Sequence, residues 1–193
     1  DDQGAFEVAG IAASAAMRFE REGRRPDGTP VRVAFSLAFA RDPQAHDIGL
    51  AVCQQHYPEN FWNAAFQTHA NGASGVAGAA MVAANPADHQ AVFQAFAGAP
   101  EIQSGAGEIS IATSRGNIAV MTPAMFEEQF GVAAPDRSGG ARPAALRLAC
   151  PDLPQTETSF SAGGIEARRH KGRLVVPADA AFGATLVFEA PQR

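Results

Sequence analysis

The chain is poor in the residues that mark disulfide-stabilised or membrane-spanning proteins. It has 193 residues but only two cysteines, one tryptophan, one tyrosine and a single lysine, Lys171. Two cysteines are too few for a disulfide framework, and Cys53 and Cys150 each lie in an apolar run, as buried free thiols do. No apolar stretch approaches the roughly 20 residues that cross a bilayer. We therefore expect a cytoplasmic protein without a membrane partner.

A concentrated basic surface is also missing. The net charge is -5 and the pI is about 5.5. The basic clusters are short, and they comprise Arg21, Arg24 and Arg25 on one side and residues 168–171 on the other. Because phosphate backbones are bound by extended positive surfaces, we expect no nucleic-acid partner. The hydrophobic fraction of 46% is that of an ordinary globular protein. At 193 residues the chain is long enough for one sizeable core or two small ones.

The C-terminal region shows the clearest order of elements. Residues 144–150 predict a buried strand, and Asp152 predicts the cap of a helix that runs to about Ala162. Two glycines end this helix, and extended segments follow at residues 165–169, 173–176 and 185–189. The predicted order is strand, helix and three strands.

The middle region repeats that order. Residues 76–83 predict a strand, and a helix opens at Asn85 and Pro86 and ends near Gly98. A hairpin of residues 108–113 and 117–121 follows. Two flanking segments are interpreted as a loop (residues 104–107) and as a short connecting helix (residues 123–130).

The first region has the same order without its leading strand. Residues 1–14 predict a helix with Gly10 at its stop, and strands follow at residues 16–21, 31–40 and 48–55. The chain does not begin with Met, so we expect further residues upstream of this sequence. Self-similarity on this scale indicates a repeat architecture.

A resemblance to a known family rests on these modules and on one segment. Residues 53–62, CQQHYPENFW, are similar to a segment that marks bacterial glyoxalase-like proteins of the vicinal oxygen chelate superfamily. That superfamily includes glyoxalase I, bleomycin-resistance proteins and extradiol dioxygenases. The resemblance implies an α+β fold of repeated βαβββ modules that form curved mixed sheets around a cavity, with helices outside. It also implies a partial glyoxalase-like domain at residues 1–71, a second domain at residues 72–193, and a fourth module upstream.

The best candidate site follows the last strand of the first region. Polar and aromatic side chains just past a strand end are exposed yet held in place, which suits ligand binding. The alternative is a packed connector with aromatic anchors. Side-chain alternation adds pocket-lining positions on the strand faces that carry small residues. The candidate ligand-binding residues are Arg32, Ser36, Gln54, Gln55, His56, Tyr57, Glu59, Asn60 and Trp62.

A metal site depends on the resemblance. Metal-dependent members place His or Gln on the first strand of a module and Glu on its last strand. In residues 72–193 these positions fall at Gly78, Ala119, Ala145 and Val187, none of which has a ligand atom. We therefore expect no metal there. In the first domain the resemblance allows a divalent Zn, Ni or Fe ion, with His56 as the candidate ligand.

Two functional hypotheses stay open. The first is a glyoxalase-type lyase or isomerase that acts on a small carbonyl compound, with a metal polarising the carbonyl. The second is a metal-free protein that binds or sequesters a small molecule in an aromatic-lined cleft, as bleomycin-resistance proteins do. Both predict a small-molecule ligand, and a homodimer is one option for the assembly. No catalytic residue is assigned.

Overall fold

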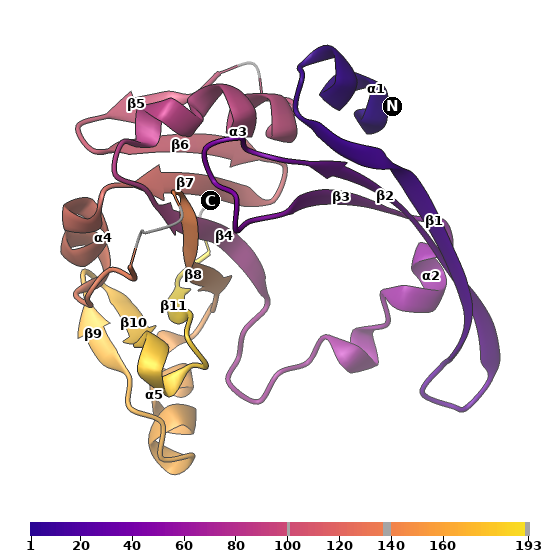
Figure 1. The fold of residues 1–193 in the computed structure, drawn as a ribbon. Helices are drawn as coiled ribbons and strands as arrows, with labels where there is room; N and C mark the ends of the chain where they lie inside the picture. The colour runs from indigo at the N-terminus through magenta and orange to yellow at the C-terminus, as the bar shows by residue number, and fades with distance from the viewer. Residues whose placement is uncertain (100, 137–139, 192–193) are drawn as a thin grey trace.

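The structure, a computed structural model, describes residues 1–99, 101–136 and 140–191. It is an α+β fold in which strands predominate and form two curved sheets (Figure 1). The smaller sheet has the strand order β1-β2-β3, and the larger has the order β5-β6-β7-β4-β8-β11-β10-β9. The strands are β1 (Ala12–Arg24), β2 (Pro30–Ala40), β3 (Leu50–Gln55), β4 (Gly75–Val82), β5 (Gln103–Gly105), β6 (Glu108–Thr113), β7 (Gly116–Met121), β8 (Arg142–Ala149), β9 (Arg168–His170), β10 (Arg173–Val176) and β11 (Thr185–Glu189).

Short helices connect the strands. The α-helices are α1 (Asp2–Val8), α2 (Pro58–Phe61), α3 (Gln90–Ala97), α4 (Pro123–Phe130) and α5 (Leu153–Ala162), and the 3-10 turns are η1 (Ala64–Phe66), η2 (Pro86–His89) and η3 (Ala178–Ala180). The predicted cap of α5 is present, since the Asp152 carboxylate accepts a hydrogen bond from the Gln155 amide at 2.9 Å. None of the helices in the described ranges is long and apolar enough to cross a membrane.

The larger sheet is built from two copies of one unit. In the first copy β7 pairs in parallel with β4, and in the second β11 pairs in parallel with β8. The remaining strands of each copy add antiparallel, and β4 pairs antiparallel with β8 at the centre. This confirms the two predicted βαβββ repeats. One detail was wrong: β5 falls in a segment interpreted as a loop, because its pairing with β6 extends the sheet at an edge.

Each face of the larger sheet has its own helices. The aromatic rings of α4, Phe126 and Phe130, pack on the face that carries Ala80, Ala119 and Val187, and we call this the inner face. Helices α3 and α5 pack on the opposite face. Because side chains alternate along a strand, neighbouring residues of the same strand contribute to separate apolar clusters on the two faces of the sheet.

The smaller sheet follows a helix and has three antiparallel strands in chain order. This is the order of the other modules without a leading strand. The predicted helix was too long: α1 ends at Val8, the backbone turns at Gly10 with φ of +70°, and β1 begins at Ala12. The side chain of Phe6 on α1 packs against β2 and stacks on Phe96 of α3 at a centroid distance of 5.8 Å.

A buried polar pair ties the smaller sheet to the larger one. His89 at the end of η2 and Asp42 after β2 are in hydrogen-bond contact at 2.6 Å, and both side chains are buried. Figure 1 shows α1 beside α3, with the start of β1 directly after α1. The smaller sheet lies within residues 1–71 and the larger within 72–193, and the division into two domains at that point stays a prediction.

Candidate functional site

The segment of residues 54–62 lies where the sequence predicts it, directly past a strand end. β3 ends at Gln55, but the amide of His56 still donates to the carbonyl of Ala34 at 2.9 Å. Pro58 then begins α2, whose Phe61 ring meets Phe35 of β2 edge-on at 5.5 Å. The helix therefore packs against one face of the smaller sheet.

The strand register divides the predicted lining residues between two faces. Ser36 is opposite Gln54, whereas Gln55 is opposite Phe35. Because neighbouring residues point to opposite faces, Ser36 and Gln55 do not share a pocket wall. Gln55 lies on the face that α2 covers, and Arg32 and Ser36 lie on the other face together with Glu20.

His56 is held by polar neighbours on the face opposite α2. Its Nε2 lies 2.7 Å from the Ser36 hydroxyl and 3.4 Å from Nη1 of Arg18. A guanidinium can only donate, so Nε2 serves as the acceptor for Arg18. This nitrogen is thereby occupied and lies beside a positive charge, which disfavours a cation at the same place.

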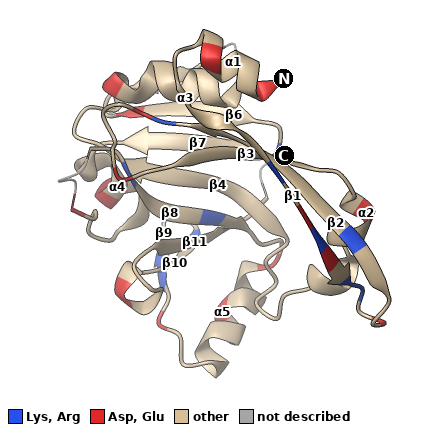
Figure 2. Ribbon diagram, turned by 45° about the vertical axis from the view of Figure 1, so that its right-hand side comes forward, with Lys and Arg blue, Asp and Glu red and all other residues tan. Residues whose placement is uncertain are grey.

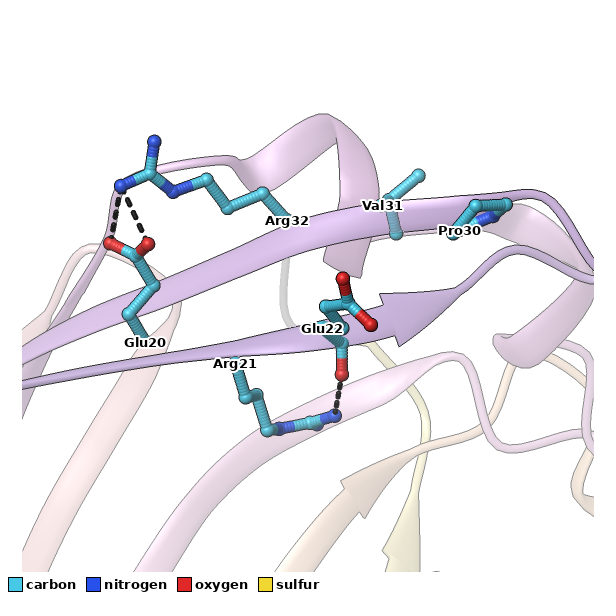
Figure 3. Close-up of a pocket in the computed structure, with 6 residues that line it drawn as sticks. All are labelled: Glu20, Arg21, Glu22, Pro30, Val31 and Arg32. Carbon is cyan, nitrogen blue, oxygen red and sulfur yellow. Dashed lines mark hydrogen bonds and ion pairs between the residues drawn. The ribbon is translucent and has the colours of Figure 1, made fainter.

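Arg32 belongs to a surface charge network. Its guanidinium pairs with Glu20 at 2.6 Å, as Figure 3 shows, and lies 5.5 Å from the centroid of the Tyr57 ring. The hydrogen bond from Arg32 lowers the pKa of Glu20, and the same bond raises the pKa of Arg32. A shallow surface hollow of about 530 Å³ lies beside this pair. Because its best-placed charges satisfy each other, it is a weak candidate for ligand binding.

A cleft between the smaller sheet and α2 is the better candidate. Its volume is about 370 Å³, and its aromatic walls are Phe61, Trp62 and Phe66. The three residues are 40%, 55% and 58% exposed, so their rings are available to a ligand. The other lining residues are Arg21, Gly23, Arg24, Val33, Asn60 and Gln67.

The side chain of Asn60 is fixed at the cleft. Its amide nitrogen donates to the carbonyl of Arg32 at 3.0 Å, and its oxygen accepts from Nη2 of Arg25 at 2.9 Å. Two of the predicted residues, Asn60 and Trp62, thus line the cleft, whereas Glu59 is exposed and does not.

The other lining residues were not among the predicted ones, and they include Arg21, Arg24 and Phe66. The arginine cluster is visible in the sequence, but a short basic cluster by itself bears on nucleic-acid binding and does not indicate a small-molecule cleft. Phe66 follows the predicted segment by four positions and lies in the turn η1, so no strand or helix pattern pointed to it.

A second polar group lies on the inner face of the larger sheet. Arg147 on β8 donates from Nη2 to Glu189 on β11 and from Nη1 to Asn117 on β7, both at 2.5 Å. Arg173 donates to the other oxygen of Glu189 at 2.9 Å, and Asn117 donates to Ser110 at 2.8 Å. The network joins strands of both modules. A hollow of about 520 Å³ borders it at Ser110 and Asn117.

Glu108 adds a half-buried carboxyl to this inner face. Removal from water raises its pKa, and the positive charges of Arg147 and Arg173 oppose that rise only in part. Of this group only Glu189 was noticeable in the sequence, through its position at the end of a last strand. Arg147 was hidden because its partners are 30 and 42 residues away along the chain.

The side chains present do not fit a metal centre. Nowhere in the described part of the chain do three His, Cys, Asp or Glu side chains come together as a ligand group. Gly78, Ala119, Ala145 and Val187 offer no ligand atoms, and both oxygens of Glu189 are bonded to arginines.

Comparison with known proteins supports the fold. A hypothetical protein from Staphylococcus aureus superposes with a TM-score of 0.56 at 7% identity, over 98% of this chain and 61% of its own length. Methylmalonyl-CoA epimerase from Mycobacterium tuberculosis gives a TM-score of 0.49 at 16% identity, over 68% of this chain and 97% of its own. No family model matches the chain, and the comparison with curated proteins finds no match either.

The likeness to the Staphylococcus aureus protein shows the fold alone, and the superposition on the epimerase, with a TM-score below 0.5, shows neither a shared fold nor a shared activity. This chain spans 61% of the length of the Staphylococcus aureus protein. The paired βαβββ modules and curved sheets define an α+β protein whose architecture is consistent with the vicinal oxygen chelate fold.

Proposed function

We propose that this protein binds a small organic molecule in the cleft between β1, β2 and α2, without a metal of its own. The observation that carries the proposal is the aromatic lining of this 370 Å³ cleft by Phe61, Trp62 and Phe66. The volume lies within the range of small-molecule pockets, roughly 300–1,000 Å³. A bound ring would cover apolar surface that is otherwise exposed to water, which favours binding.

The sheet and α2 hold the walls of the cleft in place. Val33 lines the cleft from β2, and the contact of Phe61 with Phe35 fixes α2 on the sheet. Asn60 locks the same helix to the carbonyl of Arg32. A cleft whose walls are positioned before binding loses less conformational entropy when a ligand enters.

Trp62 makes the proposal directly testable, because it is the only tryptophan of the chain and lines the cleft. Titration with small aromatic and heteroaromatic compounds should change its fluorescence. Calorimetry with the same compounds should give a dissociation constant that a chelator leaves unchanged.

Two aromatic substitutions provide matched variants. Phe66→Ala removes one wall of the cleft and should weaken binding by about 5- to 10-fold, the worth of an aromatic contact of roughly 1 kcal/mol. Phe182→Ala removes a fully exposed ring outside the cleft and should leave affinity unchanged. Failure of every compound to bind, or equal effects of the two substitutions, would refute the proposal.

A further inference from the structure

The arginines of this chain divide into paired and unpaired groups. Arg18 and Arg32 contact Glu20, Arg147 and Arg173 contact Glu189, and Arg169 contacts Glu157. Within the described ranges, by contrast, Arg21 and Arg24 form no ion pair with a carboxylate. Arg25, Arg41, Arg115 and Arg168 also form no ion pair in these ranges, but of this unpaired group only Arg21 and Arg24 line the aromatic cleft.

The two guanidiniums are held by backbone acceptors that leave most of their donors free. Nη1 of Arg21 donates to the carbonyl of Glu22 at 3.4 Å, and Nη1 of Arg24 donates to the carbonyl of Gly28 at 3.1 Å. Each guanidinium has five N–H donors, so the remaining ones are available to a ligand. Figure 3 shows the side chains of Arg21 and Glu22 leaving β1 on opposite sides, which keeps the Glu22 carboxylate away from Arg21.

Neighbouring charges do not cancel this positive end of the cleft. Figure 2 shows acidic and basic residues following one another along β1, and those that pair do so on the face opposite α2. Arg25, the third member of the cluster, donates to Asn60 and lowers the pKa of Asp27 only as a lesser cause, after the hydrogen bonds from Thr29. The cleft thus has aromatic rings along its wall and two unpaired positive charges at its rim.

We infer that the ligand of this cleft is a small planar molecule that carries a carboxylate. Its ring would lie against Trp62 and Phe66, and its carboxylate would accept hydrogen bonds from Arg21, which leaves β1 on the face that α2 covers. Arg24, which lines the cleft from the end of β1, would add the attraction of its positive charge. Guanidinium and carboxylate match each other in a planar, two-bond geometry, which a neutral amide of the same shape cannot reproduce. The inference rests on the proposed function, and it adds the chemical class of the ligand.

The test compares isosteric acids and amides. Calorimetric titrations with benzoate and benzamide, and with cinnamate and cinnamamide, should show each acid binding about 10- to 100-fold more tightly than its amide. The preference should fall as the salt concentration rises, since both charges are exposed. Phenyl phosphate, titrated alongside, should bind no more tightly than benzoate.

Charge-matched double variants identify the residues responsible. Arg21→Gln with Arg24→Gln should reduce the acid-to-amide ratio to about 1 while changing amide affinity by less than about 2-fold. Arg115→Gln with Arg168→Gln removes the same net charge from exposed positions outside the cleft and should preserve the ratio. Thermal unfolding of both variants verifies that each is folded.

The outcomes separate the two proposals. Equal binding of acids and amides to the unaltered protein would overturn the carboxylate assignment and leave the binding cleft intact. Preference for phenyl phosphate over benzoate by more than about 10-fold would overturn it in favour of a phosphate ligand. An acid preference that survives in the Arg21 and Arg24 variant would remove these residues from the site. Absence of binding by all compounds would sink the proposed function itself.

Discussion

Arg147 and Glu189 form an ion pair at 2.5 Å in which each side chain is only 7% exposed. The two residues lie on neighbouring parallel strands, and Arg147 also bonds to Asn117 of the other module. The pair therefore joins two strands of the second βαβββ unit, and the bond of Arg147 to Asn117 links this pair to the first unit on the inner face of the larger sheet. Burial makes it far more sensitive to loss of one partner than a surface pair is.

Glu189→Gln should destabilise the protein by about 3–5 kcal/mol, because it removes the carboxylate that is bonded to the buried Arg147 guanidinium. Glu157→Gln is the matched control, since it breaks the exposed pair with Arg169 and should cost only a small fraction of that loss. Denaturant unfolding measures both values. Equal, small losses in the two variants would show that the inner pair contributes no more than a surface pair.

Gly78→Ala should cost about 1–3 kcal/mol, because the added methyl group would clash with the backbone carbonyl of Asn117 and would also meet its side-chain oxygen at 2.6 Å, displacing that oxygen from Arg147. Gly75→Ala, in the same strand, adds a methyl group with no heavy atom within 4 Å. We expect this control to change the free energy of unfolding by less than about 0.5 kcal/mol. Similar values for the two would mean that both the backbone and the side chain of Asn117 can shift at little cost.

Glu108→Gln should stabilise the protein increasingly as the pH rises from 4.5 through the raised folded pKa of Glu108. Burial raises the pKa of Glu108, so the folded state binds its proton more tightly than the unfolded state does. Ionising the carboxyl therefore costs stability as the pH rises from the ordinary value of 4.5 through the raised folded pKa, and the amide avoids that loss. Unfolding curves of both proteins at several pH values give the difference directly.

Glu157 should give the opposite dependence of stability on pH, because its pKa is lowered whereas that of Glu108 is raised. The hydrogen bond from Arg169 lowers the pKa of Glu157, so its carboxylate stabilises the fold above the ordinary value of 4.5 and loses this effect as the pH falls through the lowered pKa. Glu157→Gln should therefore become less stable relative to the unaltered protein as the pH rises. If the Glu108 and Glu157 variants showed the same trend, the local environments described above would be wrong.

The two cysteines should differ in their reaction with a thiol reagent. Cys53 is exposed on β3, whereas Cys150 is fully buried, and burial raises the pKa of the Cys150 thiol. The native protein should react rapidly at one thiol and the unfolded protein at two. The Cys53→Ser variant should show no rapid reaction in the native state. Rapid modification of Cys150 would indicate that the core beneath α5 opens.

Much of the local structure could be predicted because its signals lie within a few residues of one another. The strands Arg173–Val176 and Thr185–Glu189 and the helix Pro123–Phe130 have the predicted bounds. Their alternation, caps and prolines act through neighbouring backbone groups. Where the local signal competed with pairing, the prediction failed: Ala12 and its neighbours favour a helix but join β1, because β2 offers ladder hydrogen bonds.

The candidate site was predictable only in part. A strand end followed by Asn60 and Trp62 marked the right segment, since polar and aromatic residues after a strand are a local pattern. The separation of Ser36 from Gln55 depended on the register between β2 and β3, which no single strand specifies. Cys53 was expected in the interior and is exposed, because the face it occupies is only partly covered by α2.

The sequence by itself determined the repeated order of strands and helices and the segment that carries the aromatic residues, because both are set by contacts between near neighbours along the chain. Tertiary structure alone decided that Arg21 and Arg24 meet Trp62 in one cleft and that Arg147 meets Glu189 inside the larger sheet. These encounters join residues that are distant along the chain. Sheet curvature and strand register bring them together, and both arise only when whole modules pack.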